Sequence, residues 1–190
     1  MASEMPSGSE MQSRIVTHSL LNRLLEREGF NPGLFELKKR ETGKPYGIIE
    51  GRTVGVSITH CRDLLVTALH VNGEIGIDVE ACSRKMHPRL HERICHPDER
   101  NYLPEDLCCI RMWTIKEAAL KYLGTGLRMA MNKIKLKMEQ EHLFRAETGD
   151  ADLLLYSFLF RDHWIAVALQ DDRQDVENDL QRLHQARDGL

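Results

Sequence analysis

Residues 113–127 read WTIKEAALKYLGTGL, and the rest of the chain is interpreted around this stretch. It is predicted to be the end of a helix that starts near Pro104, because good helix formers follow that proline and Gly124 stands where a left-handed C-cap belongs. Glu117 and Lys121 are four residues apart, so they share one face of this helix. Taken alone, such a pair is also typical of the solvated face of an ordinary amphipathic helix.

A second stretch, residues 74–80, reads EIGIDVE and alternates apolar side chains with others, which predicts a β-strand. Asp78 and Glu80 are two residues apart, so they point to the same side of this strand, where two like charges repel each other. A hard cation between them would remove the repulsion, and carboxylate oxygens are ligands that Mg²⁺ accepts. The alternative is an exposed strand end that carries two solvated acids.

Together the two stretches resemble the 4′-phosphopantetheinyl transferases. That family carries a G-[IV]-D-x-E strand and, some tens of residues later, a W-[ST]-x-K-E-A-x-x-K helix, and both patterns are complete here. The resemblance implies transfer of the 4′-phosphopantetheine group from coenzyme A to a serine of an acyl or peptidyl carrier protein, with release of 3′,5′-ADP. It also implies Mg²⁺ as a cofactor, coordinated by Asp78, Glu80 and Glu117.

The resemblance further implies which residues bind coenzyme A. The family's G-K-P loop matches residues 43–45, and its F-N-x-S-H stretch matches residues 56–60, where only the histidine and one hydroxyl are kept. Arg14 is added for its spacing to the G-K-P loop and its place at the start of the first helix, although an exposed salt bridge is an alternative there. The expected coenzyme A ligands are Arg14, Lys44, Pro45, Thr59, His60, Asp78 and Lys121.

The reaction that the resemblance implies depends on charge stabilisation and positioning more than on covalent help from the enzyme. Glu117 and Lys121 are its expected catalytic residues on the motif helix. Glu99 is the candidate general base, because a glutamate follows the D-x-E strand at a similar spacing in the larger transferases. Residues 97–99 could equally be an ordinary helix start, with a proline and two acids in the first turn.

A basic stretch follows the predicted metal strand and is the candidate docking surface for an acidic carrier protein. A solvated basic surface is the alternative. The residues of this stretch are Arg84, Lys85, Met86, Arg89, Leu90 and Arg93.

The predicted elements favour an α+β fold of two similar lobes, each with a helix and an antiparallel sheet. Weak internal repeats support two lobes, as in the larger (Sfp-type) transferases. Because those proteins usually start with a strand and almost nothing precedes Arg14, it stays open whether the first lobe is trimmed. The expected units are a disordered N-terminus (1–10), an N-terminal lobe (11–77), a C-terminal lobe (78–170) and a polar tail (171–190).

Composition narrows the function classes. The net charge of −3 argues against general nucleic-acid binding, which needs a basic surface. No apolar run reaches transmembrane length, and the polar first ten residues are unlike a signal peptide. The five cysteines have irregular spacing without a C-x-x-C, which predicts free thiols in a cytoplasmic protein. We expect a monomer, because two lobes complete a site within one chain.

Two other functions remain open at this point. One is another Mg²⁺-dependent phosphoryl or nucleotidyl transferase, although the chain lacks a G-x-x-x-x-G-K-[ST] motif for nucleoside triphosphates. The other is a non-catalytic carrier-binding module, which would be expected to have lost at least one of the three acids.

Overall fold

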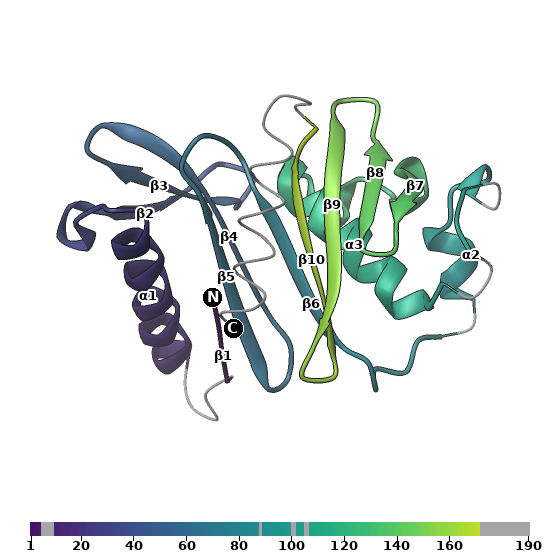
Figure 1. Cartoon of the computed structure of the whole chain (residues 1–190), viewed down its shortest axis with the longest axis horizontal. Coiled ribbons are helices and arrows are strands. Elements are labelled where there is room, and N and C mark those ends of the chain that lie inside the picture. The colour runs from purple at the N-terminus through teal and green to yellow at the C-terminus, as the bar shows by residue number, and fades with distance from the viewer. Residues whose placement is uncertain (5–9, 88, 100–101, 105–106, 172–190) are drawn as a thin grey trace.

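The computed structural model describes residues 1–4, 10–87, 89–99, 102–104 and 107–171 (Figure 1). Within these residues the chain forms two antiparallel sheets of five strands each. The first sheet contains β1 (Ala2–Glu4), β2 (Glu36–Lys39), β3 (Pro45–Ile49), β4 (Arg52–His60) and β5 (Leu64–His70). The second sheet contains β6 (Gly76–Ala81), β7 (Lys135–Gln140), β8 (Leu143–Glu147), β9 (Asp152–Phe160) and β10 (His163–Gln170). The α-helices in the described part are α1 (Glu10–Arg27), α2 (Leu90–Ile94) and α3 (Cys109–Leu123).

The two sheets have the same topology. Their strand orders are β1-β5-β4-β3-β2 and β6-β10-β9-β8-β7, so in each lobe four consecutive strands form a meander and the lobe's first strand pairs with its last. The long helix of each lobe lies between the first strand and the meander in sequence. This repetition confirms the predicted α+β fold of two similar lobes.

The N-terminus differs from its prediction. Residues 1–10 were expected to be disordered, but Ala2–Glu4 form β1, which pairs with β5 through Ala2↔Val66 and Glu4↔Leu64. The reason is that the repeated topology leaves an edge of β5 open, and a short segment satisfies its backbone groups there. A strand therefore precedes α1, as in the second lobe. Residues 5–9 and most of the predicted tail lie outside the described residues.

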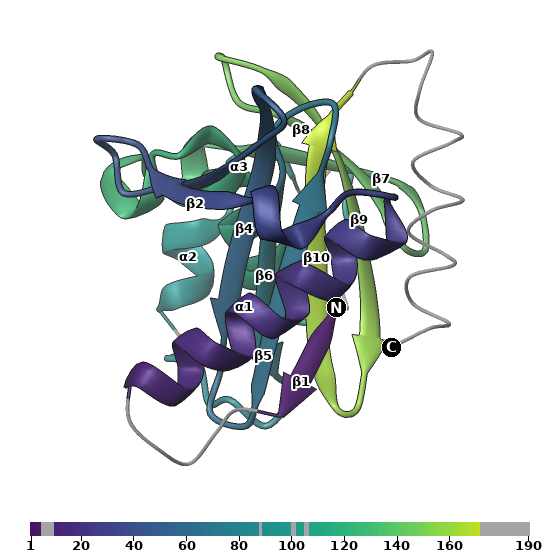
Figure 2. The same ribbon diagram turned by 90° about the vertical axis from the view of Figure 1, so that its left-hand side faces the viewer.

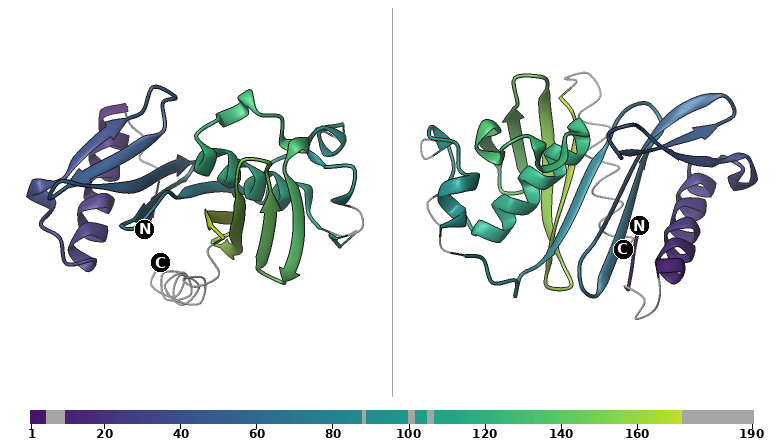
Figure 3. Two further views of the ribbon diagram at one scale, coloured as in Figure 1. Left: turned by 90° about the horizontal axis from the view of Figure 1, so that it is seen from above. Right: turned by 180° about the vertical axis from the view of Figure 1, so that it is seen from behind.

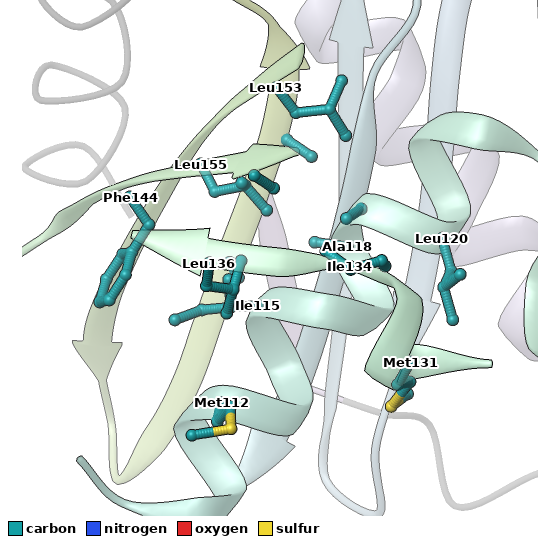
Figure 4. Close-up of a cluster of buried hydrophobic side chains, with 14 of the residues drawn as sticks. Met112, Ile115, Ala118, Leu120, Met131, Ile134, Leu136, Phe144, Leu153 and Leu155 are labelled. Atoms are coloured by element: carbon teal, nitrogen blue, oxygen red, sulfur yellow. The ribbon is translucent and has the colours of Figure 1, made fainter. Parts of the chain in front are cut away.

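Three apolar clusters form the core, one within each lobe and one between the two sheets. Leu21 and Leu25 of α1 pack on the first sheet, with Ile49, Val54 and Val56. The second cluster packs α3 against the second sheet (Figure 4). The third lies between the sheets, and its buried members are Leu64, Val66, Ala68, Ile75, Ile77, Val79, Tyr156, Phe158, Ile165, Val167 and Leu169. The first sheet therefore separates α1 from the second lobe (Figures 2 and 3).

Helix α3 ends as predicted and starts later than predicted. Gly124 is its C-cap in the left-handed region, with φ of 70°. The helix begins at Cys109 and not near Pro104, because Cys108 is its N-cap and has non-helical geometry with ψ of 128°. The sequence interpretation also missed β3 and β8, which are short and do not show a clear apolar alternation. Among the described residues, no helix is long and apolar enough to span a bilayer.

Candidate active site

The two motif segments come together because Gly76 lets α3 lie directly on β6. A Cβ atom at residue 76 would be 2.1 Å from the carbonyl oxygen of Ala118 and 2.5 Å from the amide nitrogen of Tyr122. Any side chain larger than hydrogen would therefore meet the helix backbone. The motif glycine is thus explained by packing, and it places the carboxylates of β6 beside the polar face of α3.

Asp78 is the centre of a buried polar cluster between the lobes. It is 4% exposed, and its Oδ1 accepts hydrogen bonds from Thr59 Oγ1 at 3.0 Å and from Lys121 Nζ at 2.7 Å. Lys121 also donates to Thr59 Oγ1 at 2.8 Å. The structure therefore brings together three residues predicted for the site, one from β4, one from β6 and one from α3.

The second carboxylate oxygen of Asp78 is buried and has no hydrogen-bond partner among the described residues. Burial raises the pKa of Asp78 above its usual value, despite the neighbouring Lys121. Burial also raises the pKa of Glu117, and the negative charge of Asp78 adds to that shift. Two partly desolvated carboxylates that repel each other, one with a free oxygen, form a donor set that fits a divalent cation such as Mg²⁺.

Glu80, the third predicted metal ligand, points to the same side of β6 as Asp78 and forms an ion pair with Arg84. The Arg84 guanidinium in turn lies 5.3 Å from the centre of the Trp113 ring, at the start of the motif. The positive charge of Arg84 also reaches Glu117, where it opposes the rise in pKa. Arg84 therefore neutralises part of the acidic cluster and links it to α3.

Lys44 contacts the end of α3 next to Lys121 in sequence, but has partners of its own. Its Nζ donates to the carbonyl oxygen of Tyr122 and forms an ion pair with Glu74 at 2.5 Å. The residue is only 8% exposed, and burial lowers the pKa of Lys44. Pro45 follows as the first residue of β3. The G-K-P loop thus reaches the C-terminal end of α3, and Lys44 would have to leave Glu74 to contact a phosphate.

The two remaining predicted coenzyme A ligands lie in different places. His60 is exposed at the end of β4, directly after Thr59, so its side chain leaves the strand on the side opposite to that of Thr59. Arg14 is exposed on α1, on the outer side of the first sheet, in a groove with Met11 and His18. The structure does not bring Arg14 to the cluster, because the apolar side of α1 packs on the sheet and leaves Arg14 facing away from the second lobe.

The geometry of Glu99 argues against its predicted role as general base. It is 2% exposed and forms an ion pair at 2.5 Å with Lys116, which is fully buried. Its Oε1 also accepts from the amide of Leu136 at 2.9 Å, and its Oε2 accepts from the amide of His96 at 2.7 Å. Both oxygens are therefore occupied inside the protein, and a base must reach the hydroxyl that it deprotonates.

Sequence reasoning missed two residues that position the site. Lys116 donates to the carbonyl oxygens of Ile94 at 2.6 Å and Ile134 at 2.9 Å, so it ties α3 to the segments on either side of it. The sequence could have indicated its burial, because Lys116 lies four residues from both Met112 and Leu120 and so shares the buried face of α3 with them. Ser57 accepts from the amide of Ile77 at 3.0 Å and holds β4 against β6, and no local pattern marks it.

Comparisons with known proteins agree with this geometry. A search of curated proteins finds no match to the chain. A family model described as the 4′-phosphopantetheinyl transferase superfamily matches residues 74–172, which is slightly more than half of the 190 residues. The matched region contains both motif segments and the whole second sheet. The buried acid cluster, Lys121 and the family match lead to one conclusion: the chain belongs to the 4′-phosphopantetheinyl transferase superfamily.

Proposed function

We propose that this protein is a Mg²⁺-dependent enzyme that transfers the 4′-phosphopantetheine group from coenzyme A to a serine of an acyl or peptidyl carrier protein. The observation that carries the proposal is the buried Asp78. One of its carboxylate oxygens has no hydrogen-bond partner among the described residues, and its charge repels that of Glu117, so a bound cation would stabilise both carboxylates. Lys121 lies beside it at 2.7 Å. A divalent cation and a lysine at one point suit a pyrophosphate group better than any uncharged substrate.

Each residue of the cluster has a distinct task in this reaction. Asp78, Glu80 and Glu117 would hold Mg²⁺, which when bound neutralises charge on the pyrophosphate. Lys121, which donates to Asp78 in this structure, would instead donate to a phosphate of coenzyme A when the carboxylates hold the cation. Thr59 keeps both side chains in register through its hydroxyl. These residues act by positioning and charge stabilisation, which is where phosphoryl transfer gains most of its rate.

The carrier protein is proposed to dock on the basic stretch that follows β6. Lys85, Arg89 and Arg93 are exposed there and are available to an acidic partner. Arg84 already forms an ion pair with Glu80, so it is less available to an acidic partner than these three residues. Leu90 packs against the core of the second lobe and is less suited to the docking surface than its neighbours.

The test is mass spectrometry of apo carrier proteins from fatty-acid, polyketide and peptide synthesis after incubation with coenzyme A and Mg²⁺. We expect one class to gain the mass of the phosphopantetheine group at its serine. Glu117→Gln should lose this activity and stay folded, whereas Glu147→Gln, at an exposed carboxylate of β8, should keep it. Substantial Mg²⁺-dependent transfer by Glu117→Gln would refute the metal assignment.

The same experiment separates the other functions. Binding of coenzyme A without modification of any carrier would favour a carrier-binding module. Transfer of a phosphoryl or nucleotidyl group to another acceptor would favour a different Mg²⁺-dependent transferase.

A further inference from the structure

A second group of metal-binding residues lies where the hairpins of the two lobes meet. Cys61 and Asp63 belong to the turn between β4 and β5, and His163 starts β10 after the equivalent turn of the second lobe. Cys61 packs against the apolar cluster between the sheets, and His163 is 7% exposed. These residues are separate from the Asp78 cluster and lie outside the motif segments 43–45, 56–60, 74–80 and 113–127.

The donor atoms of these three side chains have separations close to those of a metal site. The Sγ of Cys61 lies 3.6 Å from Oδ1 of Asp63, the Nε2 of His163 lies 2.9 Å from the same oxygen, and the donor atoms all lie within 4.8 Å of one another. In a tetrahedral zinc site, usual bond lengths place sulfur about 3.6 Å from oxygen and nitrogen about 3.3 Å from oxygen. Only small side-chain shifts are needed to surround an ion.

The hydrogen bonding of His163 is that of an oriented metal ligand. Its Nδ1 lies 2.5 Å from the carbonyl oxygen of Arg161, so Nδ1 must carry the proton and donate it. In a neutral imidazole, Nε2 then has a lone pair that faces the Asp63 carboxylate, and two acceptors would oppose each other. A cation between them resolves the conflict, and a carbonyl that accepts from the other ring nitrogen is the usual way to orient a histidine ligand.

We propose that Cys61, Asp63 and His163 form a zinc site that ties the two lobes together at their hairpin turns. A thiolate, an imidazole and a carboxylate suit Zn²⁺, whereas the all-carboxylate cluster around Asp78 suits Mg²⁺. On binding, the Cys61 thiol releases its proton to solvent and becomes a thiolate ligand. Three protein ligands leave a fourth position for water. Because Cys61 and His163 lie in different lobes, the ion would restrain the interface that carries Thr59 and Asp78.

The experiment titrates the metal-free, reduced protein with Zn²⁺ and with Co²⁺ in excess Mg²⁺, which occupies the carboxylate cluster. We expect one Zn²⁺ per chain, a higher thermal midpoint, and a near-ultraviolet thiolate band for the Co²⁺ form. Cys61→Ser and His163→Gln should each lose the band and the thermal shift. The controls are Cys82→Ser, at an exposed cysteine whose amide donates to the carbonyl oxygen of Asp162, and Cys95→Ser, whose Sγ lies near His91. Both should keep the band and the thermal shift.

Two results would overturn the proposal. If the wild-type protein shows no thiolate band, His163 is instead doubly protonated and forms a simple ion pair with Asp63. If the band persists in Cys61→Ser and disappears in Cys95→Ser, the ion is bound by Cys95 and His91 at the end of α2. This measurement does not involve carrier modification, so a negative result for the zinc site would leave the proposed transfer reaction untouched.

Discussion

Replacement of Gly76 by alanine tests whether close packing of α3 on β6 builds the active site. The added Cβ would lie 2.1 Å from a backbone oxygen of α3, whereas ordinary contacts begin at 3.4 Å, so the helix must retreat by about 1.3 Å. Because the obstacle is backbone, no side-chain rotation can relieve it. Overpacking of this kind costs about 1–3 kcal/mol, which lowers the Tm of a chain of this size by roughly 2–12 °C.

The same movement should reduce activity more than stability. Lys121 Nζ lies 2.7 Å from Asp78 Oδ1, and a shift of this size would stretch the contact beyond hydrogen-bonding range. A misplacement of about 1 Å can lower the rate about 100-fold. We therefore expect Gly76→Ala to lose about two orders of magnitude in kcat/KM at temperatures where it remains folded.

The assays are thermal unfolding and carrier modification, measured side by side. Gly33→Ala is the matched control, because its Cβ would meet only the Asn31 side chain, at 3.2 Å. A Gly76→Ala protein with the Tm and kcat/KM of the wild type would refute the packing argument. Loss of activity in Gly33→Ala as well would show that the measured loss is not specific to the α3–β6 contact.

Further predictions concern the buried ion pair, the cofactor and the carrier. Lys116→Met should lower the free energy of unfolding, measured in urea, by about 3–5 kcal/mol, because it leaves the Glu99 charge buried without its partner. Adding Glu99→Gln to this variant should restore part of the lost stability. If Glu99→Gln alone keeps its Tm but loses most of its kcat, the general-base role returns. Lys121→Met should weaken coenzyme A binding in calorimetry, and equal weakening of dephospho-coenzyme A would place Lys121 at the pyrophosphate and not at the 3′-phosphate. The double reversal Lys85→Glu/Arg93→Glu should raise KM for the carrier and leave KM for coenzyme A unchanged. The control Lys39→Glu/Arg52→Glu, at exposed positions of the first lobe, should change neither constant. An unchanged carrier KM in the first variant would place the docking surface elsewhere.

The sequence by itself determined the parts of this protein that depend on local spacing. Two residues along a strand, or four along a helix, always share a face, so the acids of β6 and the Glu117–Lys121 pair of α3 could be assigned before any packing was known. Gly124 could be assigned as a C-cap because the left-handed conformation at the end of a helix is a local requirement that glycine meets. Weak sequence repeats predicted two similar lobes, and the two sheets have the same strand order.

Only the tertiary structure decided which charged residues meet each other. Glu99 has the spacing expected of a general base, but it pairs with Lys116, which no local pattern connects to it. Arg14 has a suitable position in the chain but lies on the outer side of the first sheet. Cys61 and His163 are about a hundred residues apart and come together through the packing of the lobes. The energy of a charge depends on its burial and its nearest partners, and long-range folding sets both.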